Sequence, residues 1–188
     1  MALAFGACIR KKAPPSPSPP AGSASVSAGE TPSGYVVAHV AGVTHLPSGG
    51  DVVLLVESGK KRAIPIFIGG TEALSIQLRV EKKTYKRPLT HDLLDTSVSK
   101  LGGRIESVRV DKIVDGIFYG TVVLVNGQSR FELDARPSDA IALALGNEAP
   151  IQVAASVFER AGVELDRAPD EIQRRAEPHP GQPEPVSL

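Results

Sequence analysis

The stretch from Phe131 to Gly146, FELDARPSDAIALALG, constrains the fold more strongly than any other part of this chain. Apolar and charged residues alternate from Phe131 to Asp134, which is typical of a strand with one buried face. Proline lacks an amide hydrogen and suits the first turn of a helix, so a helix is expected to begin at Pro137. The run that follows is apolar on every side. It therefore predicts a helix that is buried in the core and ends at Gly146.

The junction between this strand and this helix is crowded with polar side chains: Asp134, Arg136, Ser138 and Asp139. In a structural interpretation, Ser138 or Asp139 caps the helix and Arg136 pairs with a neighbouring carboxylate to close the turn. In a functional interpretation, the carboxylates bind a metal or activate water beside an arginine that binds phosphate. Spacing along the chain leaves both interpretations open.

The remaining apolar patterns and turn signals predict further strands and helices. Strands are expected at residues 35–46, 51–57, 62–68, 104–111, 117–125, 128–134 and 150–153, and helices at residues 71–80, 90–101, 137–145 and 155–161. Strands joined by short turns outnumber strands joined through helices, which indicates an α+β fold with a mainly antiparallel sheet and about four helices. The second helix is expected to bury Leu94, Val98 and Leu101.

Proline content marks the borders of the folded part. Proline and small residues dominate residues 13–32, and proline becomes frequent again after residue 167. These compositions predict a disordered tether at 1–32, one folded domain at 33–166 and a disordered Pro-rich tail at 167–188.

The chain begins MALAFGAC, followed by the basic run IRKK. This start is similar to the end of a bacterial lipoprotein signal, in which the cysteine is lipidated. Because the stretch is short and has no basic start, that interpretation requires a start codon further upstream. The localisation stays open between a cytoplasmic protein with a disordered arm and a cell-envelope lipoprotein anchored through Cys8.

Charge and composition exclude several classes of function. The 21 basic and 21 acidic residues cancel, so the net charge does not indicate a nucleic-acid or membrane partner. Cys8 is the only cysteine, which excludes an intrachain disulfide and a cysteine-based zinc site. No apolar run is long enough for a transmembrane segment. Aromatic residues are 4% of the chain, too few for an extended stacking platform.

Two further helix starts carry candidate functional groups. Glu72 follows Thr71, the expected N-cap of the first helix, and His91 and Asp92 follow Thr90, the expected N-cap of the second. The positive end of the helix dipole disfavours a protonated histidine, so His91 is suited to act as a general base or metal ligand. The alternative is a polar residue with no role beyond the helix start.

The segment RVEKKTYKR, residues 79–87, has five basic residues and one acidic residue, with Tyr85 among them. It predicts either a solvated loop or a patch that faces phosphate.

Several motifs together resemble the bifunctional nuclease domain family. They are RPLTHDLL at 87–94 and DARPSDAIALAL at 134–145, with IPIFIG, DGIFY and APIQV at 64–69, 115–119 and 149–153. The similarity spans roughly residues 52–163 and implies a compact α+β domain, self-association into a homo-oligomer, and nuclease activity on DNA and RNA. One departure is residues 79–84, RVEKKT, where the family pattern has small residues.

Two functions follow as hypotheses. The first is a phosphodiesterase acting on nucleic acid with a divalent metal such as magnesium, held by Asp134 and Asp139 with Glu72 as a further candidate ligand. In that hypothesis His91 is the base or a ligand oriented by Asp92, while Arg87, Arg136 and Ser138 bind phosphate. The second is a non-catalytic oligomeric binding or regulatory module, in which the same groups form ion pairs. A cluster of these side chains around one cleft would favour the enzyme.

Overall fold

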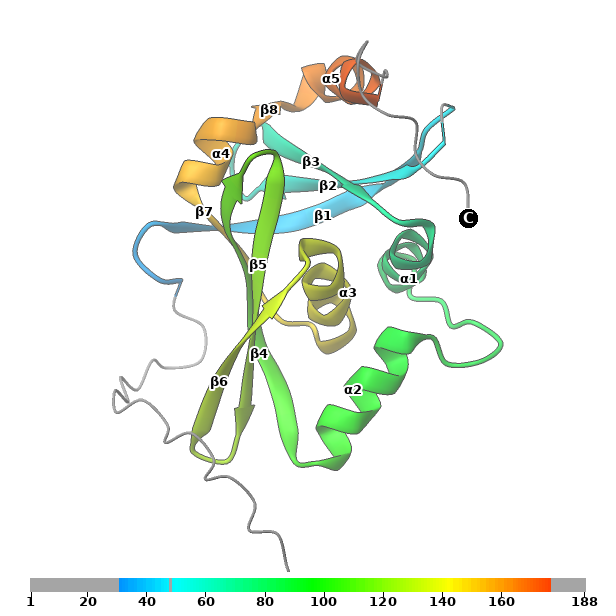
Figure 1. Ribbon diagram of the computed structural model, residues 1–188, viewed down its shortest axis with the longest axis vertical. Helices are drawn as coiled ribbons and strands as arrows, with labels where there is room; N and C mark the ends of the chain where they lie inside the picture. Colours follow the sequence, from blue (N-terminus) through cyan, green and yellow to red (C-terminus); the bar gives the residue numbers. More distant parts are fainter. Residues whose placement is uncertain (1–30, 48, 177–188) are drawn as a thin grey trace, which may run out of the picture.

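One eight-stranded sheet runs through the part of the chain that the computed structural model describes, residues 31–47 and 49–176 (Figure 1). The strands are β1 (Tyr35–His45), β2 (Asp51–Glu57), β3 (Arg62–Ile68), β4 (Gly103–Val114), β5 (Ile117–Asn126), β6 (Ser129–Ala135), β7 (Ile151–Ala154) and β8 (Val163–Glu164). Their order is β6-β5-β4-β7-β1-β2-β3-β8, and every pairing except the parallel β4–β7 pair is antiparallel. This topology confirms the predicted α+β class.

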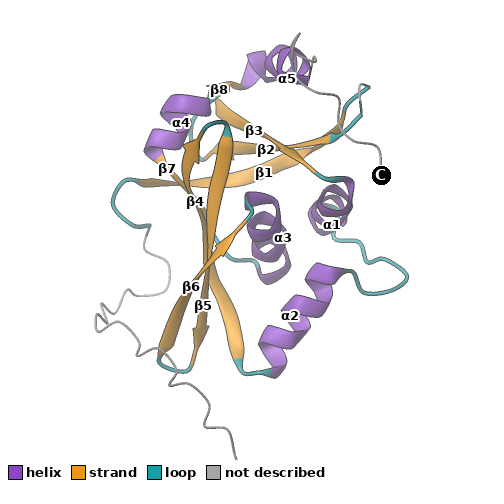
Figure 2. Ribbon diagram, viewed as in Figure 1, coloured by secondary structure: helices purple, strands orange, loops and turns teal. Residues whose placement is uncertain are grey.

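Five α-helices accompany the sheet in the described residues, one more than predicted (Figure 2). They are α1 (Gly70–Val80), α2 (Thr90–Lys100), α3 (Pro137–Asn147), α4 (Ala155–Ala161) and α5 (Ala168–Ala176), and a 3-10 turn at Leu165–Arg167 precedes α5. Helices α1, α2 and α3 lie together on one side of the sheet. None of the helices described is long and apolar enough to cross a membrane.

Helix α3 lies at the centre of the core and contacts α1, α2, β4 and β5. It begins at Pro137 as predicted, and Ala140 to Ala144 are buried. It ends at Asn147, and the left-handed conformation belongs to Glu148, with φ of 52°. The prediction that Gly146 ends the helix is therefore wrong. Gly146 lies inside the helix, where a Cβ would overlap the guanidinium of Arg79.

The expectation that β6 buries its apolar face is also wrong. Phe131 and Leu133 are 48% and 47% exposed, because β6 is the edge strand and pairs only with β5. Alternation marks which residues share a face of a strand, but it does not say whether another element covers that face.

Helix α2 buries much less than its pattern predicts. Leu94 and Leu101 are 45% and 78% exposed, and Val98 is half-buried. The buried residue of this helix is His91. The helix packs against α3 and β4 through its start and one side, so its leucines face outward.

The described structure continues past residue 166, where the sequence predicts the start of a Pro-rich tail. Ile172 of α5 packs with Leu46 and Val52 in a second small core. Pro169 occupies the first turn of α5, where its missing amide costs little, so its presence is compatible with a helix. The predicted tether before residue 31, with Cys8, and the last twelve residues of the predicted tail lie outside the described residues.

Candidate functional site

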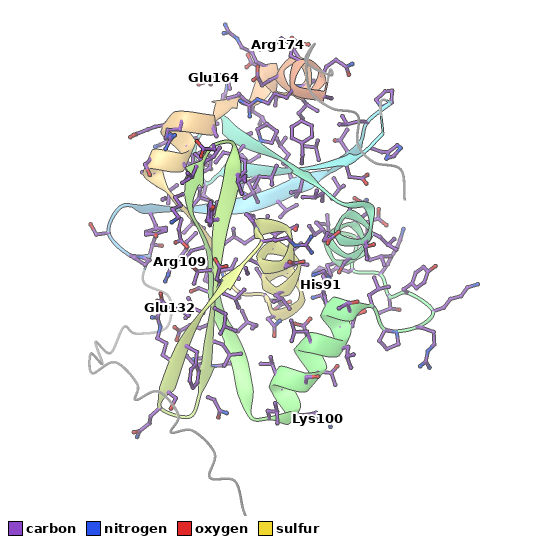
Figure 3. All side chains as sticks on the ribbon, in the orientation of Figure 1. His91, Lys100, Arg109, Glu132, Glu164 and Arg174 are labelled. Carbon is purple, nitrogen blue, oxygen red and sulfur yellow. The ribbon has the colours of Figure 1, made fainter. Side chains whose placement is uncertain are left out.

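The first turns of three helices meet in one cluster of ionisable side chains. Glu72 lies in the first turn of α1, His91 in that of α2 and Asp139 in that of α3, while Arg136 is the N-cap residue of α3. These four residues are called the helix-start cluster below. Figure 3 shows His91 where the three helices come together.

Arg136 and Asp139 hold the helix-start cluster together. Nε of Arg136 donates to Oδ2 of Asp139 at 2.8 Å, and Nη2 donates to Oδ1 at 3.0 Å. The same Nη2 also donates to Oε1 of Glu72. Nε2 of His91 lies 3.2 Å from Oδ1 of Asp139. The two motifs RPLTHD and DARPSD thus meet through a histidine–carboxylate contact, although His91 and Asp139 are 48 residues apart.

These contacts fix the charge of the cluster. Burial alone would raise the pKa of the Asp139 carboxyl, but the hydrogen bonds from Arg136 and His91 hold that pKa below its ordinary value. The pKa of Arg136 is raised by the hydrogen bonds that it donates, most strongly by those to Asp139 and next by the one to Glu72. Asp139 is therefore ionised at neutral pH and acts as an acceptor towards both Arg136 and His91.

Of the four residues of the cluster, Arg136 lines a cavity of about 460 Å³, and Glu72, His91 and Asp139 do not. Arg136, Pro137 and Ser138 form one part of its lining, and Phe67 and Ile117 are among the apolar residues that form the rest. The side chain of Arg136 is 66% exposed, whereas that of His91 is only 10% exposed. A ligand in the cavity would therefore meet the guanidinium and the buried Ser138 first.

Asp134 lies apart from the cluster. It pairs with Thr121 across the β5–β6 ladder. Strand alternation places it on the same face as Glu132, opposite to Ala135, which packs against the core. Among the described residues, no three histidine, cysteine, aspartate or glutamate side chains are grouped as a metal ion would require. The three carboxylates considered as metal ligands are therefore not gathered here.

Asp92 does not orient His91 in this structure. Its Oδ2 accepts a hydrogen bond from the Leu89 amide at 2.8 Å, which caps α2, and its Oδ1 lies 2.9 Å from Nη2 of Arg79. The residue that contacts the imidazole is Asp139. Arg87 is exposed in the loop before α2 and has no ion pair within residues 31–47 and 49–176.

The buried role of Arg79 has little signal in the sequence. Its side chain is only 10% exposed, and Nη2 contacts Asp92 at 2.9 Å and Asp95 at 2.8 Å. Asn147 donates to the other oxygen of Asp95 at 2.8 Å. Arg79 therefore belongs to an ion-pair network between α1, α2 and α3, and not to the exposed basic segment that follows it. Gly146, which leaves room for the guanidinium, is the one residue that could have signalled this.

A second charged network lies on the opposite side of the sheet from α3 (Figure 3). Arg109 donates to both oxygens of Glu132, at 3.0 and 2.8 Å, and to Asp111 at 3.1 Å. Tyr35 and Thr121 donate their hydroxyl hydrogens to the two oxygens of Asp111. This network joins β1, β4, β5 and β6, and it has no contact with the helix-start cluster among the hydrogen bonds of the described residues.

Comparison with known proteins identifies similar sequences. The sequence model of the bifunctional nuclease domain matches residues 52–166. An uncharacterized protein of Mycobacterium tuberculosis is 35% identical over 130 residues, which are 69% of this chain and 76% of the relative. Bifunctional nuclease 1 of Arabidopsis thaliana is 29% identical over 105 residues, 54% of this chain and 32% of the relative. Bifunctional nuclease 2 of Oryza sativa subsp. japonica is 25% identical over 115 residues, 60% of this chain and 35% of the relative.

Proposed function

This chain belongs to the bifunctional nuclease domain family, and on that premise we propose that it hydrolyses phosphodiester bonds of DNA, RNA or both. The observation that carries the proposal is the helix-start cluster, whose Arg136 lines the 460 Å³ cavity. It supplies a histidine paired with a carboxylate next to an exposed arginine. Hydrolysis of a phosphodiester needs a group that takes a proton from water and a cation that stabilises charge on the phosphoryl oxygens.

In this proposal His91 is the general base. Ionised Asp139 accepts the hydrogen bond from Nε2, which keeps a proton on that nitrogen and leaves Nδ1 with the lone pair. Nδ1 then takes the proton from the attacking water. The nearby carboxylate stabilises the imidazolium that forms, as in other histidine–carboxylate pairs.

Arg136 is the proposed phosphate-binding residue. A guanidinium has five N–H donors, and Arg136 uses those of Nε and Nη2 for Asp139 and Glu72. The two N–H groups of Nη1 are left to bind phosphoryl oxygens at the cavity. Ser138 lies in the same cavity wall and offers a hydroxyl, and Arg87 is proposed to bind a phosphate further along the strand.

No step of this mechanism is assigned to a metal. Glu72 and Asp139 both accept hydrogen bonds from Arg136, and Asp134 lies on the other face of β6. The side chains in this arrangement therefore do not fit a divalent cation held by these three carboxylates.

Substitutions in the cluster test the proposed activity. His91→Ala and Asp139→Asn are each expected to lower the cleavage rate of DNA or RNA oligonucleotides at least tenfold, about 1.4 kcal/mol of barrier. Glu159→Gln, at an exposed position of α4, is the matched control and should cleave at the wild-type rate. Thermal melting of each variant separates loss of chemistry from loss of folding. Normal cleavage by both cluster variants would remove His91 and Asp139 from the mechanism.

The second candidate is the non-catalytic oligomeric module. Leu93 and Leu94 of α2 and Leu101, which follows the helix, are 63%, 45% and 78% exposed. Such exposed apolar side chains often mark an interface between copies. If the module is the function, the cluster variants melt early and associate poorly, and the wild-type protein cleaves nothing. Sedimentation velocity checks the association itself, since Leu101→Glu should shift an oligomer towards monomer.

A further inference from the structure

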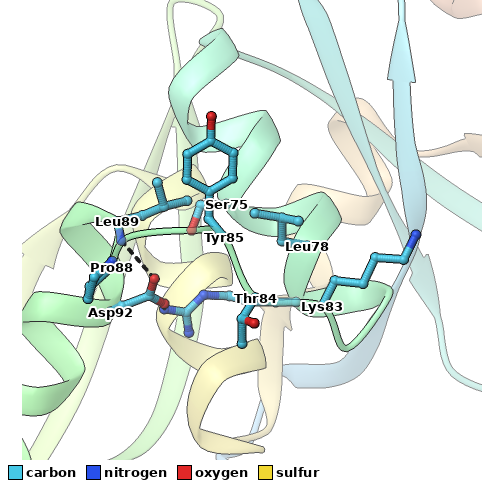
Figure 4. Close-up of a pocket in the computed structure, with 9 residues that line it drawn as sticks. Ser75, Leu78, Lys83, Thr84, Tyr85, Pro88, Leu89 and Asp92 are labelled. Carbon is cyan, nitrogen blue, oxygen red and sulfur yellow. Dashed lines mark hydrogen bonds and ion pairs between the residues drawn. The ribbon is translucent and has the colours of Figure 1, made fainter.

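A second cavity, of about 250 Å³, lies beneath the loop that joins α1 to α2 (Figure 4). Ser75 and Leu78 approach it from α1, and Pro88 and Leu89 from the start of α2. Tyr85 in the connecting loop completes the apolar part of the lining. This cavity is separate from the one beside Arg136, and the proposed chemistry does not use it.

Two buried polar atoms beside this cavity have no hydrogen-bond partner within the described residues: Oγ of Ser75 and Nε of Arg79. Ser75 is only 2% exposed, and the Arg79 side chain is 10% exposed. The two residues are four apart on α1 and therefore share a face of the helix. Both atoms are shielded from the cavity by neighbouring atoms, so an occupant would meet mainly the apolar lining.

The charges around the cavity indicate the class of its occupant. The Arg79 side chain is only 10% exposed and its Nη2 contacts the carboxylates of Asp92 and Asp95, so it offers little to an anion in the cavity. The apolar lining, with the ring of Tyr85 beside it, favours a neutral, flat group instead.

The loop itself carries the positive charge. Lys82, Lys86 and Arg87 are exposed and make no ion pair in the described part of the chain. Lys83 pairs with Glu81 at 2.7 Å and extends away from the cavity in Figure 4. Phosphates are therefore favoured on the outside of the loop, and an uncharged ring is favoured beneath it.

We propose that this cavity is a subsite for one unpaired base of a single-stranded nucleic acid. The base packs against the exposed ring of Tyr85 and lies on the apolar lining, while its flanking phosphates contact the basic loop. A base within a duplex is stacked and paired, so it cannot enter. The inference deepens the proposed nuclease function by naming the form of the substrate.

The subsite lies close to the helix-start cluster. Helix α1 carries Glu72 of the cluster and, three and seven residues later, Ser75 and Arg79 of the subsite, about 4.5 and 10 Å further along the helix axis. On α2, His91 belongs to the cluster and Asp92 to the cavity wall. A strand held at the subsite therefore passes near the proposed catalytic residues.

Binding measurements with Tyr85→Ala test the subsite independently of cleavage. Fluorescence anisotropy would compare a labelled single-stranded 12-mer, its duplex and an abasic 12-mer with the same phosphates. Loss of the ring is expected to weaken single-strand binding about tenfold and to leave duplex binding unchanged. Tyr85→Phe should keep the wild-type affinity, and Phe131→Ala, which removes an exposed ring from β6, is the matched control.

Each outcome decides one of the two proposals. Equal binding of the normal and abasic strands by the wild type, or equal affinity of Tyr85→Ala and the wild type, overturns the subsite even if the protein cleaves nucleic acid. Base-dependent binding that Tyr85→Ala abolishes supports the subsite even if no cleavage is found, in which case only the proposed nuclease activity fails.

Discussion

Gly146 lies in the last turn of α3, where helix propensity and tertiary contacts predict opposite effects of an alanine. Alanine is favoured over glycine in a helix by about 1 kcal/mol. A Cβ at this position would, however, overlap the Arg79 guanidinium and come to 2.7 Å from Oδ2 of Asp95. The guanidinium can move aside only by giving up its contacts with Asp92 and Asp95, at 2.9 and 2.8 Å.

The magnitude follows from these contacts. A hydrogen bond to a charged group contributes about 1.5 to 3 kcal/mol, so loss of both costs about 3 to 6 kcal/mol. The gain in helix propensity offsets about 1 kcal/mol of this loss. Gly146→Ala is therefore expected to lower the free energy of unfolding by about 2 to 5 kcal/mol, a large part of the stability of a typical domain.

Urea unfolding followed by circular dichroism tests this in a double-mutant cycle. Arg79→Met removes the guanidinium and is itself destabilising, because it leaves two carboxylates without their partner. In that background Gly146→Ala should raise the free energy of unfolding instead of lowering it. If Gly146→Ala stabilises the protein that retains Arg79, the guanidinium does not occupy this space and the reasoning fails.

Two further predictions concern the core and the sheet. Leu143→Asp should abolish the cooperative thermal transition, because Leu143 is 4% exposed in the core and the new charge would have no partner. A Leu143→Asp variant that melts like the wild type would contradict the central place of α3. Hydrogen bonds from Arg109, and to a smaller extent from Arg130, outweigh the effect of burial and lower the pKa of Glu132 from 4.5 to about 2. Ionised Glu132 therefore stabilises the fold fully above about pH 5, and this stabilisation is lost as the pH falls towards 2. Because this side chain is 47% exposed, the effect is about 1 kcal/mol or less, and Glu132→Gln should make acid unfolding curves less steep over that range.

The core was predictable from sequence where local signals agree with the tertiary structure. The start of α3 follows from a proline at its first position and an apolar run, both of which are local properties. The errors arise where a distant residue decides the outcome. Gly146 has the residue type of a helix stop, but it serves to admit Arg79, which lies 67 positions earlier in the chain. The exposure of Phe131 and Leu133 depends on the place of β6 in the strand order, which alternation does not encode.

In the candidate site, too, local signals were sufficient for some features and distant residues decided the others. Sequence patterns placed Glu72, His91 and Asp139 each in the first turn of a helix, and the structure places them there. Which carboxylate contacts His91 could not be predicted, because Asp92 is its neighbour in the chain and Asp139 is its neighbour in space. Asp134 and Asp139 are only five positions apart in the chain, which favours grouping them in one site. The pleat of β6 turns its side chain to the other face, and no property of an isolated motif reveals that turn.

The position of Arg136 explains why three separate helix starts can share one small volume. Each helix start presents the positive end of a dipole, and three such ends would repel one another without negative charge between them. Glu72 and Asp139 supply that charge, and Arg136 then links the two carboxylates while it leaves part of its guanidinium exposed. The same arrangement that holds α1, α2 and α3 together also leaves the two N–H groups of Nη1 of Arg136 for a ligand at the cavity. Structural and functional interpretations of this junction are therefore compatible, and they differ only in whether the exposed N–H groups of Arg136 meet a phosphate.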